Sequence, residues 1–122
     1  EMTRNRTTAI LLYNMGLIHH NIGILSGNSK ELEEALRFYS MSCTIIESSM
    51  GTIEVQDMYL LILALWNNMG HIHANFFNVE QSQFLLQCMQ GLMESMEDTI
   101  LNEEIFIFAS AIVSCPLTML AI

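Results

Sequence analysis

A six-residue phrase occurs twice in this chain: residues 14–19 read Asn-Met-Gly-Leu-Ile-His, and residues 68–73 read Asn-Met-Gly-His-Ile-His. The second copy begins 54 residues after the first, at position 68 against position 14. Each copy lies in a long apolar run that favours a helix, and a repeated helical phrase is typical of helical repeat arrays. Such arrays stack helices into a binding surface. The sequence therefore predicts a helical scaffold.

The spacing of apolar residues predicts an all-α chain of about five helices. We expect four of them at residues 3–25, 30–49, 54–77 and 79–96, with a C-terminal helix or tail at 100–122. In the first helix, apolar side chains recur at spacings of three and four, namely Ile10, Leu11, Met15, Ile18 and Ile22. The third helix is apolar on two sides, which indicates an inner helix with neighbours on both.

Turn signals separate these helices near residues 26–29, 48–52, 78–80 and 97–102. Gly27 suits the left-handed residue that ends many helices. Ser29 is followed three residues later by Leu32 rather than Glu, so it offers only half of a capping box. Residues 1–122 are expected to form a single domain, with hairpin one at 3–50, hairpin two at 54–96 and the C-terminal segment at 100–122.

Residues 105–122 contain no charged side chain. We interpret them first as a buried terminal helix that Pro116 kinks or ends. An interface exposed by truncation, through which the chain self-associates or joins further repeats, is the second reading. A membrane anchor is the third, since a bilayer span needs about 20 apolar residues. Strand character at 105–113 stays open.

The charge is strongly acidic and unevenly distributed. Thirteen acidic residues against four basic ones give a net charge of −9, and no Lys or Arg follows Arg37. A phosphate backbone would be repelled by such a surface, so nucleic acid is not expected as a partner. The acidic residues are read as a solvated face, with a surface for a basic peptide as the alternative.

Three Cys residues without a C-x-x-C pair favour unpaired thiols in a reducing compartment over a disulfide framework. No secretory signal is visible at the start of the chain. We expect an intracellular, cytoplasmic protein, and the first residue, Glu1, is compatible with an excised fragment.

The second copy of the phrase resembles the first helix of a tetratricopeptide repeat. That pattern begins with Trp, continues with an apolar-Gly pair three residues on, and has an aromatic residue three beyond the Gly. Trp66, Met69 and Gly70 match these positions, and His73 replaces the aromatic residue. In the second helix, Ser82 stands in place of the usual Ala and Leu86 in place of Phe.

The first copy matches the same repeat less closely. Met15 and Gly16 fit, whereas Leu12 replaces Trp and His19 replaces the aromatic residue. The Ala-x-x-x-aromatic signature at Ala35 comes seven residues late, after an inserted turn. In this family the Gly and the small residue lie where the two helices cross. The resemblance implies degenerate tetratricopeptide-like repeats, arranged as a superhelix of α-α hairpins.

No constellation in the sequence indicates catalysis. The four His form an adjacent pair and an i,i+2 pair, which point in different directions on a helix and cannot chelate a metal alone. No nucleophile with a patterned base and no phosphate-binding Gly loop is present. We therefore expect no enzyme activity, no cofactor and no metal. His19 and His73 are expected to fill packing positions.

The resemblance implies a binding function. In tetratricopeptide arrays the first helix of each hairpin lines a concave groove. Carried over by position, the peptide-binding residues are Tyr13, Leu17, His20, Asn21, Asn67, His71 and Asn75. None is charged, so a neutral or basic peptide or protein segment is expected there. The alternative is a structural spacer, a piece of a longer repeat array without a ligand of its own.

Overall fold

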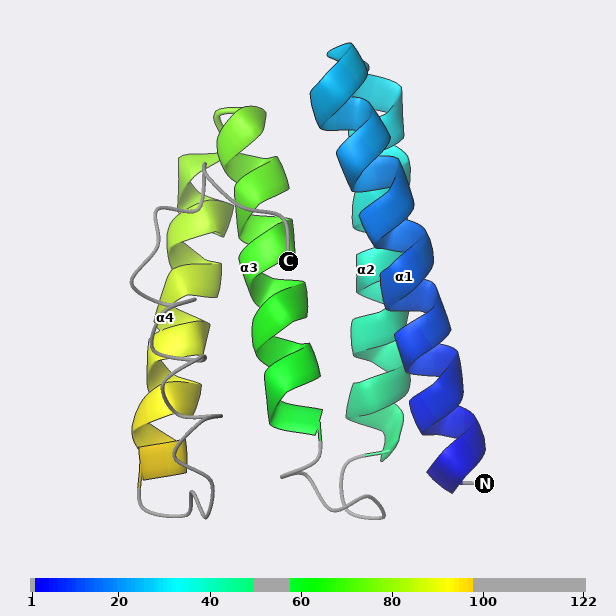
Figure 1. Cartoon of the computed structure of the whole chain (residues 1–122). Helices are drawn as coiled ribbons and strands as arrows, with labels where there is room; N and C mark the ends of the chain where they lie inside the picture. Colours follow the sequence, from blue (N-terminus) through cyan, green and yellow to red (C-terminus); the bar gives the residue numbers. More distant parts are fainter. Residues whose placement is uncertain (1, 50–57, 98–122) are drawn as a thin grey trace. The chain divides into compact units, whose positions relative to one another are not determined.

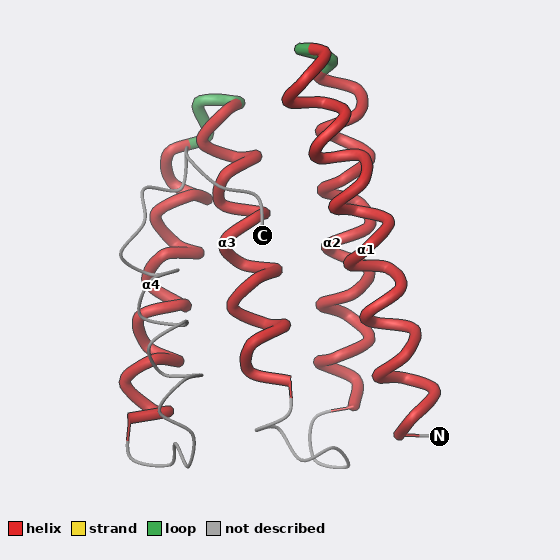
Figure 2. Tube along the Cα trace, in the orientation of Figure 1, coloured by secondary structure: helices red, strands yellow, loops and turns green. Residues whose placement is uncertain are grey.

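The computed structural model describes residues 2–49 and 58–97, which contain four α-helices and no strand. They are α1 (Met2–Ser26), α2 (Ser29–Ser49), α3 (Tyr59–Asn75) and α4 (Val79–Glu97), shown in Figure 1 and, coloured by secondary structure, in Figure 2. The predicted all-α class is confirmed. The expectations for a fifth helix at 100–122, for turns at 48–52 and 97–102 and for strand character at 105–113 lie outside the described residues.

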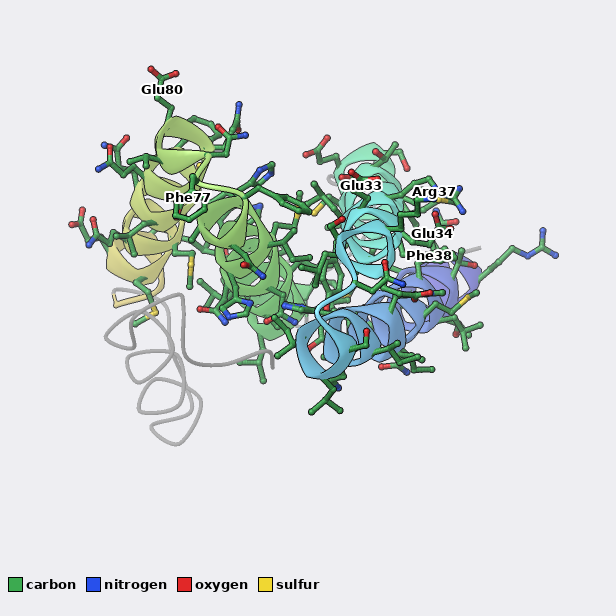
Figure 3. The ribbon with its side chains drawn as sticks, turned by 90° about the horizontal axis from the view of Figure 1, so that it is seen from above. Glu33, Glu34, Arg37, Phe38, Phe77 and Glu80 are labelled. Atoms are coloured by element: carbon green, nitrogen blue, oxygen red, sulfur yellow. The ribbon has the colours of Figure 1, made fainter. Side chains whose placement is uncertain are left out.

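The helices belong to two compact units, one holding α1 and α2 and the other holding α3 from Ile62 onward together with α4. In each unit the two helices run antiparallel and side by side, joined by a short turn (Figures 1 and 3). Each unit thus contains a helical hairpin. The superhelical arrangement of these hairpins and their union in a single domain stay predictions.

The turn of the first hairpin is confirmed at Gly27, which has a left-handed φ of 68°. The backbone N–H of Asn28 donates to the carbonyl of Gly23 at 3.1 Å, which closes the end of α1. The side-chain oxygen of Asn28 then accepts from the N–H of Lys30 at 3.0 Å. Asn28, and not Ser29, therefore caps the N-terminus of α2.

The second turn repeats this design with a different residue in the left-handed position. Phe77 adopts φ 59°, and the N–H of Asn78 donates to the carbonyl of His73 at 2.8 Å. Because Phe77 takes this conformation, α3 ends at Asn75 and not at residue 77 as predicted. The two left-handed residues are 50 positions apart, against 54 for the repeated phrase. The path from phrase to turn is therefore four residues, or about one helical turn, shorter in α3 than in α1.

Phe77 offers a test of this turn, because a left-handed conformation costs a non-Gly residue roughly 1–2 kcal/mol. Its side chain is 88% exposed, so little packing is lost on its removal. We expect Phe77→Gly to stabilise the protein by about 1 kcal/mol, measured by urea unfolding. Gly27→Ala, the matched change in the first turn, should destabilise it. A stability loss in Phe77→Gly would contradict the strain.

The helices of the first hairpin approach closely along a row of small and aromatic residues. On α1 the buried positions recur at spacings of four and three, and they are Ala9, Tyr13, Gly16, His20 and Gly23. A Cβ atom on Gly16 would lie 2.6 Å from two ring carbons of Tyr39 and 3.2 Å from the carbonyl oxygen of Ala35. The close crossing that the sequence predicts at Gly16 is confirmed.

A buried hydrogen bond continues this row toward the start of α1. The hydroxyl of Ser42 donates to the carbonyl oxygen of Ala9 at 2.7 Å. Such a bond needs the two backbones to be near, because the Ser side chain is short. The α1–α2 contact is thus built from backbone proximity, with Gly16 at its centre and Ser42 beside Ala9.

Gly16→Ala tests the close approach. Overpacking of this kind costs roughly 1–3 kcal/mol, whereas Ala is better than Gly in a helix by about 1 kcal/mol. We expect a net loss of unfolding free energy, measured by urea denaturation with circular dichroism. Gly91→Ala in α4 is the matched control, because nothing lies within 4 Å of its added Cβ. It should stabilise the protein by about 0.5–1 kcal/mol. Equal effects of the two variants would refute a crossing controlled by Gly16.

Candidate functional site

The residues predicted to line a groove differ widely in exposure. Four of them are buried, one is half-buried and two are exposed. The buried ones are Tyr13, His20, Asn67 and His71, Leu17 is half-buried, and Asn21 and Asn75 are exposed. An exposed amide or a half-exposed Leu is available to a ligand, whereas a buried ring is not. Peptide binding by this set stays a prediction, with Leu17, Asn21 and Asn75 as its accessible members.

Tyr13 and His20 lie in the contact between α1 and α2 instead of an open groove. Both rings pack on Tyr39, each with a centroid separation of 5.8 Å. The Nδ1 atom of His20 is also 3.0 Å from the hydroxyl of Tyr39, a buried hydrogen bond. From the repeat pattern we expected His19 to be the packing residue and His20 to face a ligand. The structure assigns the interior position to His20, because α1 turns this side toward Tyr39.

His19 lies at the edge of the same hairpin. Its ring stacks on Phe38 with centroids 5.4 Å apart, and its Nδ1 atom is 2.6 Å from a carboxylate oxygen of Glu31. The ring thus packs as expected, but it stays partly exposed. Since Glu31 lies in the first turn of α2, this contact ties the end of α1 to the start of α2.

A second charged contact lies next to Phe38 on α2. The guanidinium of Arg37 is 5.0 Å from the ring centroid of Phe38 and binds the carboxylate of Glu34, as Figure 3 shows. This hydrogen bond holds the pKa of the partly exposed Glu34 below its usual value, with smaller contributions from the charges of Arg37 and His19. These groups form a solvated edge of the hairpin. Among the described residues, no three His, Cys, Asp or Glu come together as a metal site.

One side of α1 is a row of exposed apolar side chains, which we call its outer face. The row consists of Leu11, Met15, Ile18, Ile22 and Leu25. Leu11 is 57% exposed and Ile18 58% exposed. No Asp, Glu, Lys or Arg occurs between Arg6 and Lys30, so the face carries no charge. An amphipathic helix normally turns such a stripe to its core. Here the stripe points away from α2, because α2 packs on the small-residue side of α1.

Two positions of α3 that correspond to the outer face of α1 are buried. Leu65 and Ile72 of α3 correspond to Leu11 and Ile18 of α1, at the spacing of 54 residues, and both are 0% exposed. Buried residues occur on every side of α3, as the sequence predicts for a covered helix. At these two positions α3 is covered where α1 is open, whereas Phe76 and Val79, which correspond to Ile22 and Leu25, are exposed.

Comparisons with models of known protein families, with curated proteins and with solved structures find no match for this chain. None of the described helices has both the length and the apolar character that crossing a bilayer requires.

Cys43 on α2 is the one nucleophilic side chain whose environment is strongly perturbed within the described residues. Burial, and to a lesser extent the carboxylate of Glu47, raise the pKa of its thiol from 9.0 to about 12. A thiol is nucleophilic only as the thiolate. The environment therefore suppresses the reactivity of Cys43 and argues for a packing role.

This suppression is measurable by alkylation. At pH 8 a pKa of about 12 in place of 9.0 lowers the thiolate fraction about 1000-fold. We expect Cys43 to react with iodoacetamide far more slowly in the folded protein than in urea, followed by peptide mass spectrometry. Raising the pH toward 10 should increase the folded rate in proportion to hydroxide. Fast labelling at neutral pH without denaturant would contradict a shielded thiol.

Proposed function

We propose that this chain is a non-catalytic, tetratricopeptide-like helical scaffold that binds a protein or peptide segment. The observation that supports this most directly is the outer face of α1. Isolated apolar side chains are ordinary on a protein surface, but a contiguous row of them marks an interaction site. The row has the spacing by which a helix presents its anchors to a partner.

The chemistry of the face defines the partner segment. Since no charge lies on it, a segment that binds there need not bury an unpaired ion, which would be costly. The polar neighbours on α1 are neutral, with the exposed amides of Asn14 and Asn21 beside the row. A neutral, apolar helical segment fits this surface.

A structural spacer is the second candidate. It is supported by the burial of Leu65 and Ile72, two positions of α3 that correspond to exposed positions of the outer face of α1. In a longer array the outer face of α1 would be covered in the same way by a further repeat. The two candidates differ in what binds: a separate molecule or more of the same polypeptide.

Site-specific photo-crosslinking tests the proposed function. A benzophenone amino acid replaces Ile18 in the purified chain, which is irradiated in an extract of its native cells. We expect discrete crosslinked species, since Ile18 lies at the centre of the outer face. Ser40, exposed on α2, is the control position and should give none of them. If Ile18 crosslinks to nothing beyond its own polypeptide chain, the binding proposal fails and the spacer candidate is favoured.

A further inference from the structure

The outer face of α1 has the residue spacing of a coiled-coil seam. Leu11, Met15, Ile18, Ile22 and Leu25 follow one another at intervals of four, three, four and three. This is the 3.5-residue period of heptad positions a and d, which interlock between helices. The buried residues of α1 that face α2 take the opposite positions of the heptad. The helix therefore has two seams, and only one of them is occupied in the hairpin.

We propose that a second copy of the chain packs on this second seam with its own outer face, in an antiparallel, two-fold symmetric contact. This inference rests on the proposed function, because it names the partner that the outer face binds. A two-fold contact is isologous: each copy contributes the same residues, and one surface serves both partners. The commitment to a second copy rests on the register and on the charges at the two ends of α1.

The seam pairs with itself in one antiparallel register. When position numbers in facing pairs sum to 33, Leu11 lies opposite Ile22 of the second copy, and Met15 lies opposite Ile18. Symmetry repeats both pairs, which gives four consecutive apolar layers. Leu25 meets Thr8 at each end, so the apolar contact stops there. No layer places a charge against an apolar side chain, which would be penalised.

The edges and ends of this contact are also complementary. In the same register the exposed Asn14 of one copy flanks Asn21 of the other, where their amides can hydrogen-bond. The exposed Arg4, seven residues before Leu11 on the same side of α1, comes beside the C-terminal end of the second copy's α1. That end carries the negative pole of the helix dipole and has no basic residue in its last turn. A parallel pair would instead bring Arg4 of one copy next to Arg4 of the other.

Analytical ultracentrifugation of the full chain across a wide concentration range tests the association. We expect a mass that rises from 13.9 kDa toward twice that value. Ile18→Glu places two carboxylates near the two-fold axis, and the dimer should be lost throughout the range. Phe84→Glu is the matched control, since Phe84 is 59% exposed on α4 and should dimerise like the wild type. Circular dichroism should show both variants folded, because both positions are exposed.

Cysteine crosslinking tests the register. In a background with Cys43, Cys88 and Cys115 changed to Ala, Leu11→Cys and Ile22→Cys are made separately. Mixed together, they should be joined by a short bismaleimide, because these positions face each other. Leu11→Cys alone should not crosslink, since its two copies lie about 16 Å apart along the helix axis at 1.5 Å per residue. Crosslinking of Leu11→Cys with itself would overturn the antiparallel arrangement.

The outcomes separate this inference from the proposed function. A chain that stays monomeric at every concentration, while its Ile18 photo-crosslinks to a different protein, overturns the homodimer and keeps the scaffold. Monomeric chains whose Ile18 crosslinks only within the same polypeptide overturn both and identify the covering segment. A dimer that Ile18→Glu leaves intact also overturns the inference, because its contact then lies elsewhere.

Discussion

The contact of Gly16 with the ring of Tyr39 decides which side of α1 faces α2. Tyr39 is fully buried and also hydrogen-bonded to His20, so it has little room to move away from a larger residue. Only a residue without a Cβ atom fits opposite it. Once this side of α1 is committed to α2, the aliphatic row 100° or more around the helix cannot face the same partner. The open face of α1 thus follows from the small residue at the crossing.

The sequence was sufficient for the approximate positions of the four described helices and of the turn at Gly27, but not for the orientation of α1. Both the buried row through Gly16 and the exposed row through Ile18 recur at spacings of three and four, so periodicity alone does not rank them. Hydrophobicity favours the aliphatic row, whereas the structure packs the row with Gly, Ala, Tyr and His. The available signal was the pair Gly16 and Gly23, seven residues apart on one face, which marks where a second backbone comes near.

The His residues show the same limit. A repeat pattern places an aromatic residue at position 19, and His19 does stack on Phe38. Its neighbour His20 is nevertheless the buried one, because it lies four residues after Gly16 and so on the same side of the helix. An assignment by family position gave His20 to a ligand, and the geometry of the crossing gives it to Tyr39. A residue should therefore be assigned to a binding surface only when its position in the repeat pattern and the side of the helix on which it lies both place it there.

The two turns bear on how such hairpins can vary in length. Both turns close their helix with the same backbone hydrogen bond, from Asn28 to Gly23 and from Asn78 to His73, although the left-handed residue is Gly27 in one and Phe77 in the other. The phrase lies four residues nearer the turn in α3 than in α1. Four residues rotate a helix by about 400°, so the turn is displaced by only about 40° around the axis. Whole turns of helix can therefore be gained or lost between phrase and turn while the two helices still meet on the same side.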